Sequence, residues 1–118
     1  MRQPPSIDTY GGGGFRVSGV WRPGSLLLLD DRPAPWRPRS LAEVTAQDFA
    51  EIIAAGAATS EFVLLGTGAI QSLPPREVRE CLRRAGLGLE FMSTDGAART
   101  YGVLISEGRR VAVALIAV

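Results

Sequence analysis

Short apolar runs and helical patterns alternate along most of this chain. Residues 62–65 and 89–92 are apolar runs of strand length, and each is followed by small and hydroxyl residues and then a helical pattern. The last run, residues 110–116, is apolar at successive positions, which is typical of a strand buried on both faces of a covered sheet. The pattern therefore predicts an α/β fold with a mixed sheet and a central final strand.

Three helices are expected between these strands. The first begins at Thr45, a helix N-cap with Asp48 three residues later, and breaks at Gly56. The second occupies residues 75–86, since proline suits the first turn of a helix and apolar residues then recur on one face. The third follows the capping run at residues 93–95 and reaches Glu107.

The N-terminal third is expected to hold a smaller β-element. Residues 15–20 alternate with period two and residues 25–29 are apolar, so the two stretches are expected to pair as a hairpin. Residues 30–40 hold several prolines and are expected to be an irregular connection. Residues 1–14, which end in four glycines, are expected to be a flexible segment before a single α/β domain at residues 15–118.

Composition excludes several kinds of chemistry. The chain has 118 residues, a net charge of +1 and no histidine, and all 13 basic residues are arginine. Without histidine there is no Ser-His or Cys-His pair, and without lysine there is no Schiff base. The balanced charge gives no reason to expect nucleic acid. No cofactor or metal site is expected, and an enzyme is the less favoured class.

Compartment signals point to the cytoplasm. The single cysteine, Cys81, cannot form an intrachain disulfide, and its place on an apolar helix face predicts a small buried side chain. No apolar run approaches the about 20 residues of a transmembrane helix, and residues 1–5 lack the apolar core of a signal peptide.

The turns after residues 62–65 and 89–92 form a candidate ligand site. If the two strands are parallel neighbours, both turns open at one edge of the sheet, where α/β proteins bind ligands. Glycines admit a ligand to the backbone, hydroxyls add hydrogen bonds, and an arginine one turn into the helix can clamp an anion. The candidate ligand-binding residues are Gly66, Thr67, Gly68, Ser93, Thr94, Asp95 and Arg99. Helix capping explains the hydroxyl and acidic residues equally well, so both interpretations stay open.

A second hypothesis concerns partner binding. Trp36 lies among prolines, and Arg109 and Arg110 form a charged corner before the last strand. Aromatic and arginine side chains are favoured in protein interfaces, so these three residues are candidate partner contacts. Trp21 and Trp36 are also interpreted as cover for the core, and Tyr101 as a core residue with its hydroxyl at the surface.

Blocks spread over nearly the whole chain after Ile7 resemble one small single-domain family. They are Tyr10, Phe15, Gly24-Ser25-Leu26, Trp36, Leu65-Gly66-Thr67-Gly68, Met92-Ser93-Thr94, Ala98-Arg99-Thr100-Tyr101 and Glu107-Gly108-Arg109-Arg110-Val111. The chain resembles the domain of unknown function 498 family, which includes the third assembly factor of mitochondrial respiratory complex I. It is similar to a bacterial member, without a mitochondrial targeting segment.

The resemblance implies three layers, with a central mixed sheet covered by helices and a smaller sheet. It also implies an accessory role through protein contacts in the assembly of a membrane-bound respiratory complex, and it carries over no catalytic residue. Two positions depart from the family pattern: Ala98 stands where cysteine is frequent, and Gly102 stands where asparagine is usual. A chemistry that depended on those side chains would be missing here.

These observations lead to a first hypothesis of a non-enzymatic protein that acts through contacts with other proteins, such as membrane-complex subunits. It would be cytoplasmic, and peripheral to the inner membrane through its partners. The alternative is a small anion- or metabolite-binding protein that uses the turns at residues 66–68 and 93–99. Assembly into an oligomer of identical chains stays open.

Overall fold

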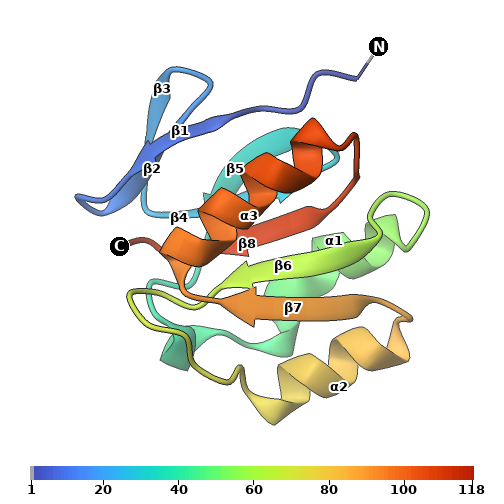
Figure 1. The fold of residues 1–118 in the computed structure, drawn as a ribbon. Helices are drawn as coiled ribbons and strands as arrows, with labels where there is room; N and C mark the ends of the chain where they lie inside the picture. Colours follow the sequence, from blue (N-terminus) through green and yellow to red (C-terminus); the bar gives the residue numbers. More distant parts are fainter. Residues whose placement is uncertain (1) are drawn as a thin grey trace.

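The computed structural model describes residues 2–118, and Figure 1 shows their arrangement. The strands in this part of the chain are β1 (Ile7–Tyr10), β2 (Gly14–Val17), β3 (Val20–Pro23), β4 (Ser25–Leu29), β5 (Arg32–Trp36), β6 (Phe62–Gly66), β7 (Gly88–Met92) and β8 (Ala112–Leu115). The α-helices are α1 (Ala50–Ala55), α2 (Arg76–Arg84) and α3 (Thr94–Ser106). Two short 3₁₀ helices, η1 (Leu41–Glu43) and η2 (Ala46–Phe49), precede α1.

The main sheet has five strands in the order β5-β4-β8-β6-β7. β8 lies in the middle, parallel to β6 and antiparallel to β4, so the sheet is mixed. β6 and β7 are parallel neighbours. These findings confirm the α/β class, the mixed sheet and the central place of the last strand.

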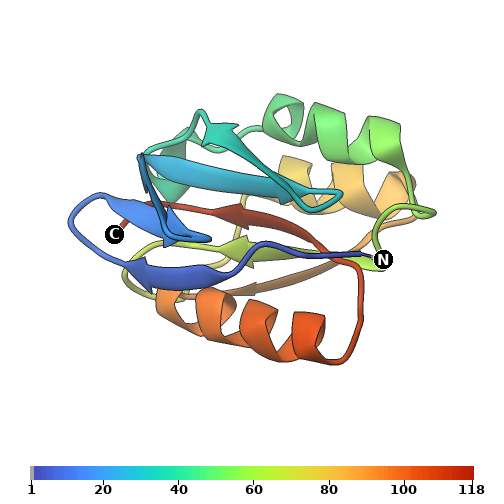
Figure 2. The ribbon, with the colours of Figure 1, turned by 90° about the horizontal axis from the view of Figure 1, so that it is seen from above.

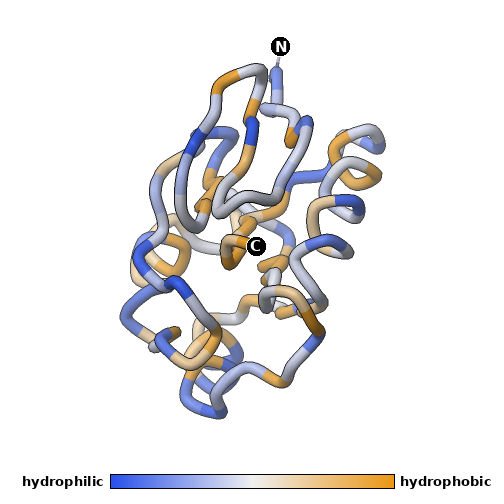
Figure 3. The backbone as a smooth tube through the Cα atoms, turned by 90° about the vertical axis from the view of Figure 1, so that its left-hand side faces the viewer, coloured by the Kyte–Doolittle hydropathy of each residue, from blue (hydrophilic) through white to orange (hydrophobic). Residues whose placement is uncertain are grey.

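The molecule has three layers, which Figure 2 shows from above. α1 and α2 cover one face of the main sheet, and α3 covers the other face together with the three-stranded sheet β1-β2-β3. Val63 and Leu65 belong to the core under α1 and α2, and Leu64 to the core on the α3 side; each is 0% exposed. Both faces of the main sheet are therefore buried, which explains why its inner strands are apolar at successive positions. In Figure 3, orange, hydrophobic segments lie in the middle of the molecule near the C-terminus, and others lie at its outside.

The predicted hairpin between residues 15–20 and 25–29 is wrong. β2 pairs with β3 through the turn at Ser18 and Gly19, whose φ angles are 46° and 81°. Such left-handed pairs form the tight turns that match the twist of a hairpin. The turn at Gly24, with φ of 83°, then leads the chain into the main sheet, where β4 finds other partners.

The expectation of an irregular connection over residues 30–40 is also wrong in part. β5 pairs with β4 after a turn at Asp30 and Asp31, both with positive φ (51° and 62°). Pro33 and Pro35 are tolerated in β5 because β5 is an edge strand and the missing N–H groups need no partner there. Prolines that indicated a loop therefore mark a protected sheet edge.

The segment at residues 1–14, expected to be flexible, holds a strand in the structure. β1 pairs with β2, and Ser18 donates a backbone hydrogen bond of 2.8 Å to Ser6. Arg2 pairs with Asp31 at 2.8 Å. Met1 lies outside the described residues. The packed unit therefore begins before Phe15.

The helices begin and end close to the predicted residues. The Thr45 backbone N–H donates to the Asp48 carboxylate at 2.9 Å, as in a capping box, and the Thr45 hydroxyl donates to the same carboxylate at 3.1 Å. The turn that follows is the 3₁₀ helix η2 before it becomes α1, which ends at Gly56 with φ of 77°. Within residues 2–118 no helix combines the length and apolar character needed to cross a membrane.

The hydroxyl of Tyr101 provides a test of how the N-terminal segment is held. It is buried and donates to the Pro5 carbonyl oxygen at 2.6 Å, and burial raises the pKa of Tyr101 to about 12. Tyr101→Phe removes one buried hydrogen bond and should lower the free energy of unfolding by about 1 kcal/mol, measured by urea denaturation. Amide exchange at Ser18 should accelerate while exchange in β8 changes little; unchanged exchange at Ser18 would contradict this attachment.

Candidate functional site

The two turns that follow β6 and β7 lie side by side, as the sequence predicts. The last residues of the strands, Gly66 and Met92, are paired across the sheet. Backbone hydrogen bonds then join the turns directly: Thr67 N–H donates to Met92 O and Thr94 N–H donates to Gly68 O, each at 2.8 Å. We call this region, residues 66–68 and 92–95, the exit edge.

Two buried threonine hydroxyls form hydrogen bonds that hold the turns of the exit edge to each other and to neighbouring segments. Thr94 is 0% exposed; its hydroxyl donates to Ile116 O at 2.7 Å and accepts from Gly68 N–H at 3.0 Å. The Thr67 hydroxyl lies 2.7 Å from Ile70 O and 3.1 Å from Met92 O, and it accepts from Ser72 N–H at 3.2 Å. Both hydroxyls are therefore fully engaged within the chain.

The start of α3 is also occupied by groups of the chain itself. Ser93 Oγ caps the helix by accepting from Gly96 N–H at 3.2 Å. The Asp95 carboxylate lies at the positive end of the helix, where an anion is favoured, and pairs with Arg99 at 2.9 Å. It also accepts a hydrogen bond from the Tyr10 hydroxyl, which raises the pKa of Tyr10. Asp95 thus occupies the N-terminal end of α3, where the sequence analysis expected an anionic ligand to bind.

The anion-binding role of the exit edge stays a prediction. Arg99 has a side chain 73% exposed, so a ligand would compete with Asp95 for it in water. A groove of about 790 Å³ lies away from the exit edge, between α2 and the segment that contains Ala46 and Ile53. These elements are on the face of the main sheet that α1 and α2 cover. The protein's own hydrogen bonds account for each hydroxyl of the exit edge without a ligand.

The charged corner with Arg109 and Arg110 lies at the opposite end of β6. Glu61, just before β6, accepts from Arg109 Nη2 at 3.1 Å and from the backbone N–H of Arg110 at 3.2 Å. These contacts lower the pKa of Glu61, with the Arg110 backbone bond as the largest cause. The Arg109 guanidinium also lies 5.5 Å from the centre of the Phe62 ring. A partner role for this corner stays a prediction, separate in space from the exit edge.

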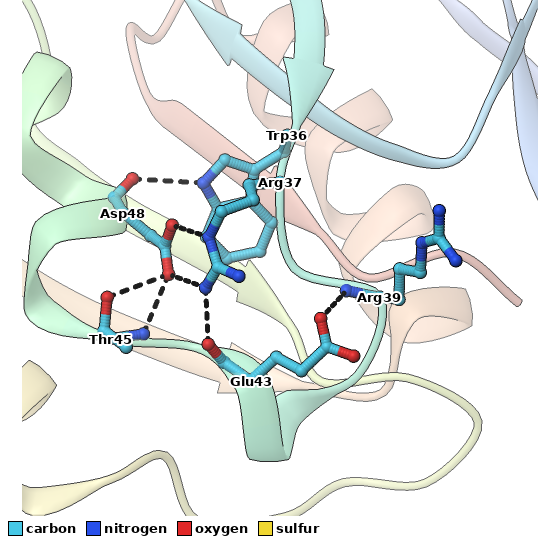
Figure 4. Close-up of polar contacts among 6 residues, drawn as sticks. All are labelled: Trp36, Arg37, Arg39, Glu43, Thr45 and Asp48. Carbon is cyan, nitrogen blue, oxygen red and sulfur yellow. Dashed lines mark hydrogen bonds and ion pairs between the residues drawn. The ribbon is translucent and has the colours of Figure 1, made fainter.

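Trp36, proposed from the sequence as a partner contact, is instead a core residue. It is 6% exposed, and its ring packs edge-on against Phe49 with centroids 5.6 Å apart. Its indole N–H donates to Asp48 O at 3.1 Å (Figure 4). The tryptophan that reaches the surface is Trp21, which is 42% exposed.

Figure 4 shows how Arg37 closes the polar cluster over Trp36. Its guanidinium donates to both carboxylate oxygens of Asp48, each at 2.8 Å, and to Glu43 O at 2.6 Å. The Arg37 contact is the main cause that lowers the pKa of Asp48, and the Thr45 cap adds to it. The proline-rich stretch is thereby tied to the start of η2.

Sequence reasoning missed the apolar loop between β6 and α2. Ile70 is 72% exposed and Leu73 is 62% exposed, and both lie in the loop that Thr67 holds in place. The signal was two large apolar residues in a stretch of glycine, serine and proline, where no strand or helix buries them. We call residues 69–73 the exit loop.

The layers and the exit edge are those of a small three-layer α/β protein, and in this chain buried threonines join the ends of two parallel strands. The chain belongs to the family described as protein of unknown function (DUF498/DUF598), whose sequence model matches residues 7–116.

Relatives agree with this assignment. An uncharacterised protein of Rhodobacter capsulatus is 38% identical over 110 residues, which cover 93% of this chain and 82% of that protein. NADH dehydrogenase [ubiquinone] 1 alpha subcomplex assembly factor 3 of Danio rerio is 29% identical, and the match covers 93% of this chain and 63% of that protein. A crystal structure of an outer membrane protein from Bartonella henselae superposes with a TM-score of 0.87 at 32% identity, covering 97% and 95% of the two chains.

Gly66 tests the tight packing of the exit edge. A Cβ at this position would lie 2.8 Å from Leu115 Cδ2 and 3.0 Å from Thr94 Cα. Gly66→Ala should therefore destabilise the protein by about 1–3 kcal/mol. In Gly102→Ala, the control in α3, the new Cβ meets nothing within 4 Å, so helix propensity should raise stability by up to about 1 kcal/mol. Urea denaturation measures both, and equal effects would contradict the packing.

Asp48→Asn tests the cluster over Trp36. Loss of the charged cap should lower the free energy of unfolding by about 1 kcal/mol at pH 7. Because the folded-state pKa of Asp48 is depressed, this stabilisation is present above the ordinary aspartate pKa of about 3.9 and is lost as pH falls through the folded value. The gap between wild type and variant should therefore close at low pH. Asp30→Asn, at a side chain 56% exposed, should change stability by less than about 0.5 kcal/mol.

Proposed function

We propose that this protein is a non-enzymatic assembly factor that acts through protein–protein contacts during the construction of a membrane-bound respiratory complex. Its partners are subunits of that complex. It works in the cytoplasm, at the inner membrane, where those partners hold it.

The observation that carries this proposal is the exposure of Ile70 and Leu73 on the exit loop. Burial of a large aliphatic side chain against a partner contributes about 1.5–3 kcal/mol. The loop is braced from within, because the Thr67 hydroxyl bonds to Ile70 O and to Ser72 N–H. A braced loop presents its apolar side chains with little loss of conformational freedom on binding, which favours affinity.

The relatives support the choice of partner. The Danio rerio relative is named as an assembly factor of NADH dehydrogenase, and it matches 93% of this chain. The Xenopus tropicalis protein of the same name is 26% identical over 111 residues. This chain spans 63% and 60% of those two proteins, so the shared domain is the part to which the proposal applies.

The double variant Ile70→Glu/Leu73→Glu tests this function. Both side chains are exposed, so the fold should keep its stability, while two charges in an apolar interface should weaken partner binding at least about tenfold. The protein is purified by affinity from its native host, and the subunits that co-purify are quantified by mass spectrometry.

Val103→Glu is the matched control, since Val103 is 58% exposed on α3, outside the exit loop. Wild type and Val103→Glu should retain respiratory-complex subunits, and the double variant should lose them. If wild type purifies without such subunits, or the double variant retains them fully, the proposal is wrong.

A further inference from the structure

In the three-stranded sheet, β2 is buried against the main sheet, but β3 is only partly covered. Phe15 and Val17 on β2 pack against the main sheet and are 0% and 2% exposed. Their cross-strand partners on β3, Arg22 and Val20, lie on the same face of the sheet. Val20 is nevertheless 57% exposed, so this face of β3 is left partly uncovered.

A groove lies where β3 stands over the β4–β5 hairpin. Its volume is about 320 Å³, and its lining is mostly apolar. Residues 20–23 of β3 form one wall, and Ser25, Leu26, Ala34 and Pro35 form the other. We call it the β3 groove. β3 belongs to the small sheet that lies on the other side of the main sheet from α1 and α2 (Figure 2).

Arg22 supplies an unmatched positive group in this groove. Its Nε atom is buried and has no hydrogen-bond partner. Among residues 2–118 no carboxylate forms an ion pair with it, although six other arginines have such a partner. A buried guanidinium N–H without an acceptor is unfavourable, and a carboxylate is the group that matches its geometry best.

The main chain of β3 can also accept a partner. β3 is an edge strand of its sheet. The turn at residues 18–19 makes Val17 and Val20 a hydrogen-bonded pair, and such pairs alternate along an antiparallel ladder. The N–H and C=O of Trp21 therefore face the free edge. Of the two edge strands that line the groove, β5 is blocked by Pro33 and Pro35, so β3 is the one open to pairing.

We propose that the β3 groove binds an extended segment of a partner protein that carries a carboxylate side chain flanked by apolar residues. This rests on the proposed function. The segment pairs with Trp21 through its main chain and places the carboxylate on Arg22. An apolar side chain two positions away then lies over Val20, because alternate side chains of a strand share a face.

A synthetic peptide probes this recognition directly. The probe is an acetylated and amidated heptapeptide, Thr-Val-Thr-Glu-Thr-Val-Thr, which presents valine on either side of the glutamate in both chain directions. Its control has glutamine in place of glutamate. Titration into ¹⁵N-labelled protein should shift the backbone amide of Trp21, which the peptide would engage directly, and the amides of its neighbours Val20 and Arg22. The glutamine peptide should bind at least about tenfold more weakly, the effect of one charged hydrogen-bonded pair.

Variants then assign the carboxylate to its partner. Arg22→Gln should weaken the glutamate peptide to the level of the glutamine peptide, and Arg84→Gln, on α2 across the main sheet, should bind like wild type. Thermal melting confirms that both variants fold. Equal affinity of the two peptides for wild type, shifts away from β3, or no shifts at millimolar peptide would each overturn the proposal, and these outcomes need no variant.

Co-purification separates this inference from the proposed function. If wild type retains respiratory-complex subunits and a folded Arg22→Gln variant retains them equally, the β3 groove takes no part in binding them and the assembly role stands. If wild type retains none while the glutamate peptide binds at β3 as described, the assembly role fails and the recognition chemistry of the groove stands.

Discussion

The whole structure depends on β8, the strand that is buried on both faces. Ala112, Val113, Ala114 and Leu115 are each 0% exposed, and their side chains divide between the two cores. β8 joins the parallel pair β6–β7 to the antiparallel pair β4–β5. Beyond its last residue, Ile116 O accepts from the Thr94 hydroxyl and Ile116 N–H donates to Gly66 O at 3.0 Å. The strand that completes the sheet thus also closes the exit edge.

Much of this fold was predictable because local patterns and the global arrangement agree. An apolar run with no polar alternation has to be covered on both sides, and this placed the last strand, β8, inside the sheet. Strand pairing in the N-terminal third was not predictable from the apolar pattern alone. Residues 20–23, with two exposed apolar side chains and a proline, resemble a turn. The prolines of β5 are compatible with a strand only because β5 lies at the edge of the sheet, where their missing N–H groups leave no ladder hydrogen bond unmade.

The position of the candidate site was predictable from the sequence, but the hydrogen-bond partners of its side chains were not. Two parallel strands that end in small residues must bring their turns together, so the neighbourhood of Gly66 and Ser93 followed from the sequence. The acceptor of the Thr94 hydroxyl lies 22 residues further along the chain, and no local rule identifies such a partner. The same limit applies to Trp36, because the group that fixes its indole is a backbone carbonyl in η2, reached only after the chain has turned back.

The edge strands β3 and β5 differ in their protection, and this difference has a consequence for self-association. At β5, prolines prevent another strand from adding to the sheet, but β3 has no such protection at Trp21, and Val20 beside it is exposed. An unprotected edge is a template on which another strand can pair, and a second molecule of the same sequence presents the same edge. Pairing of two copies through β3 would grow with protein concentration, whereas the proline-bearing edge at β5 would stay closed to it.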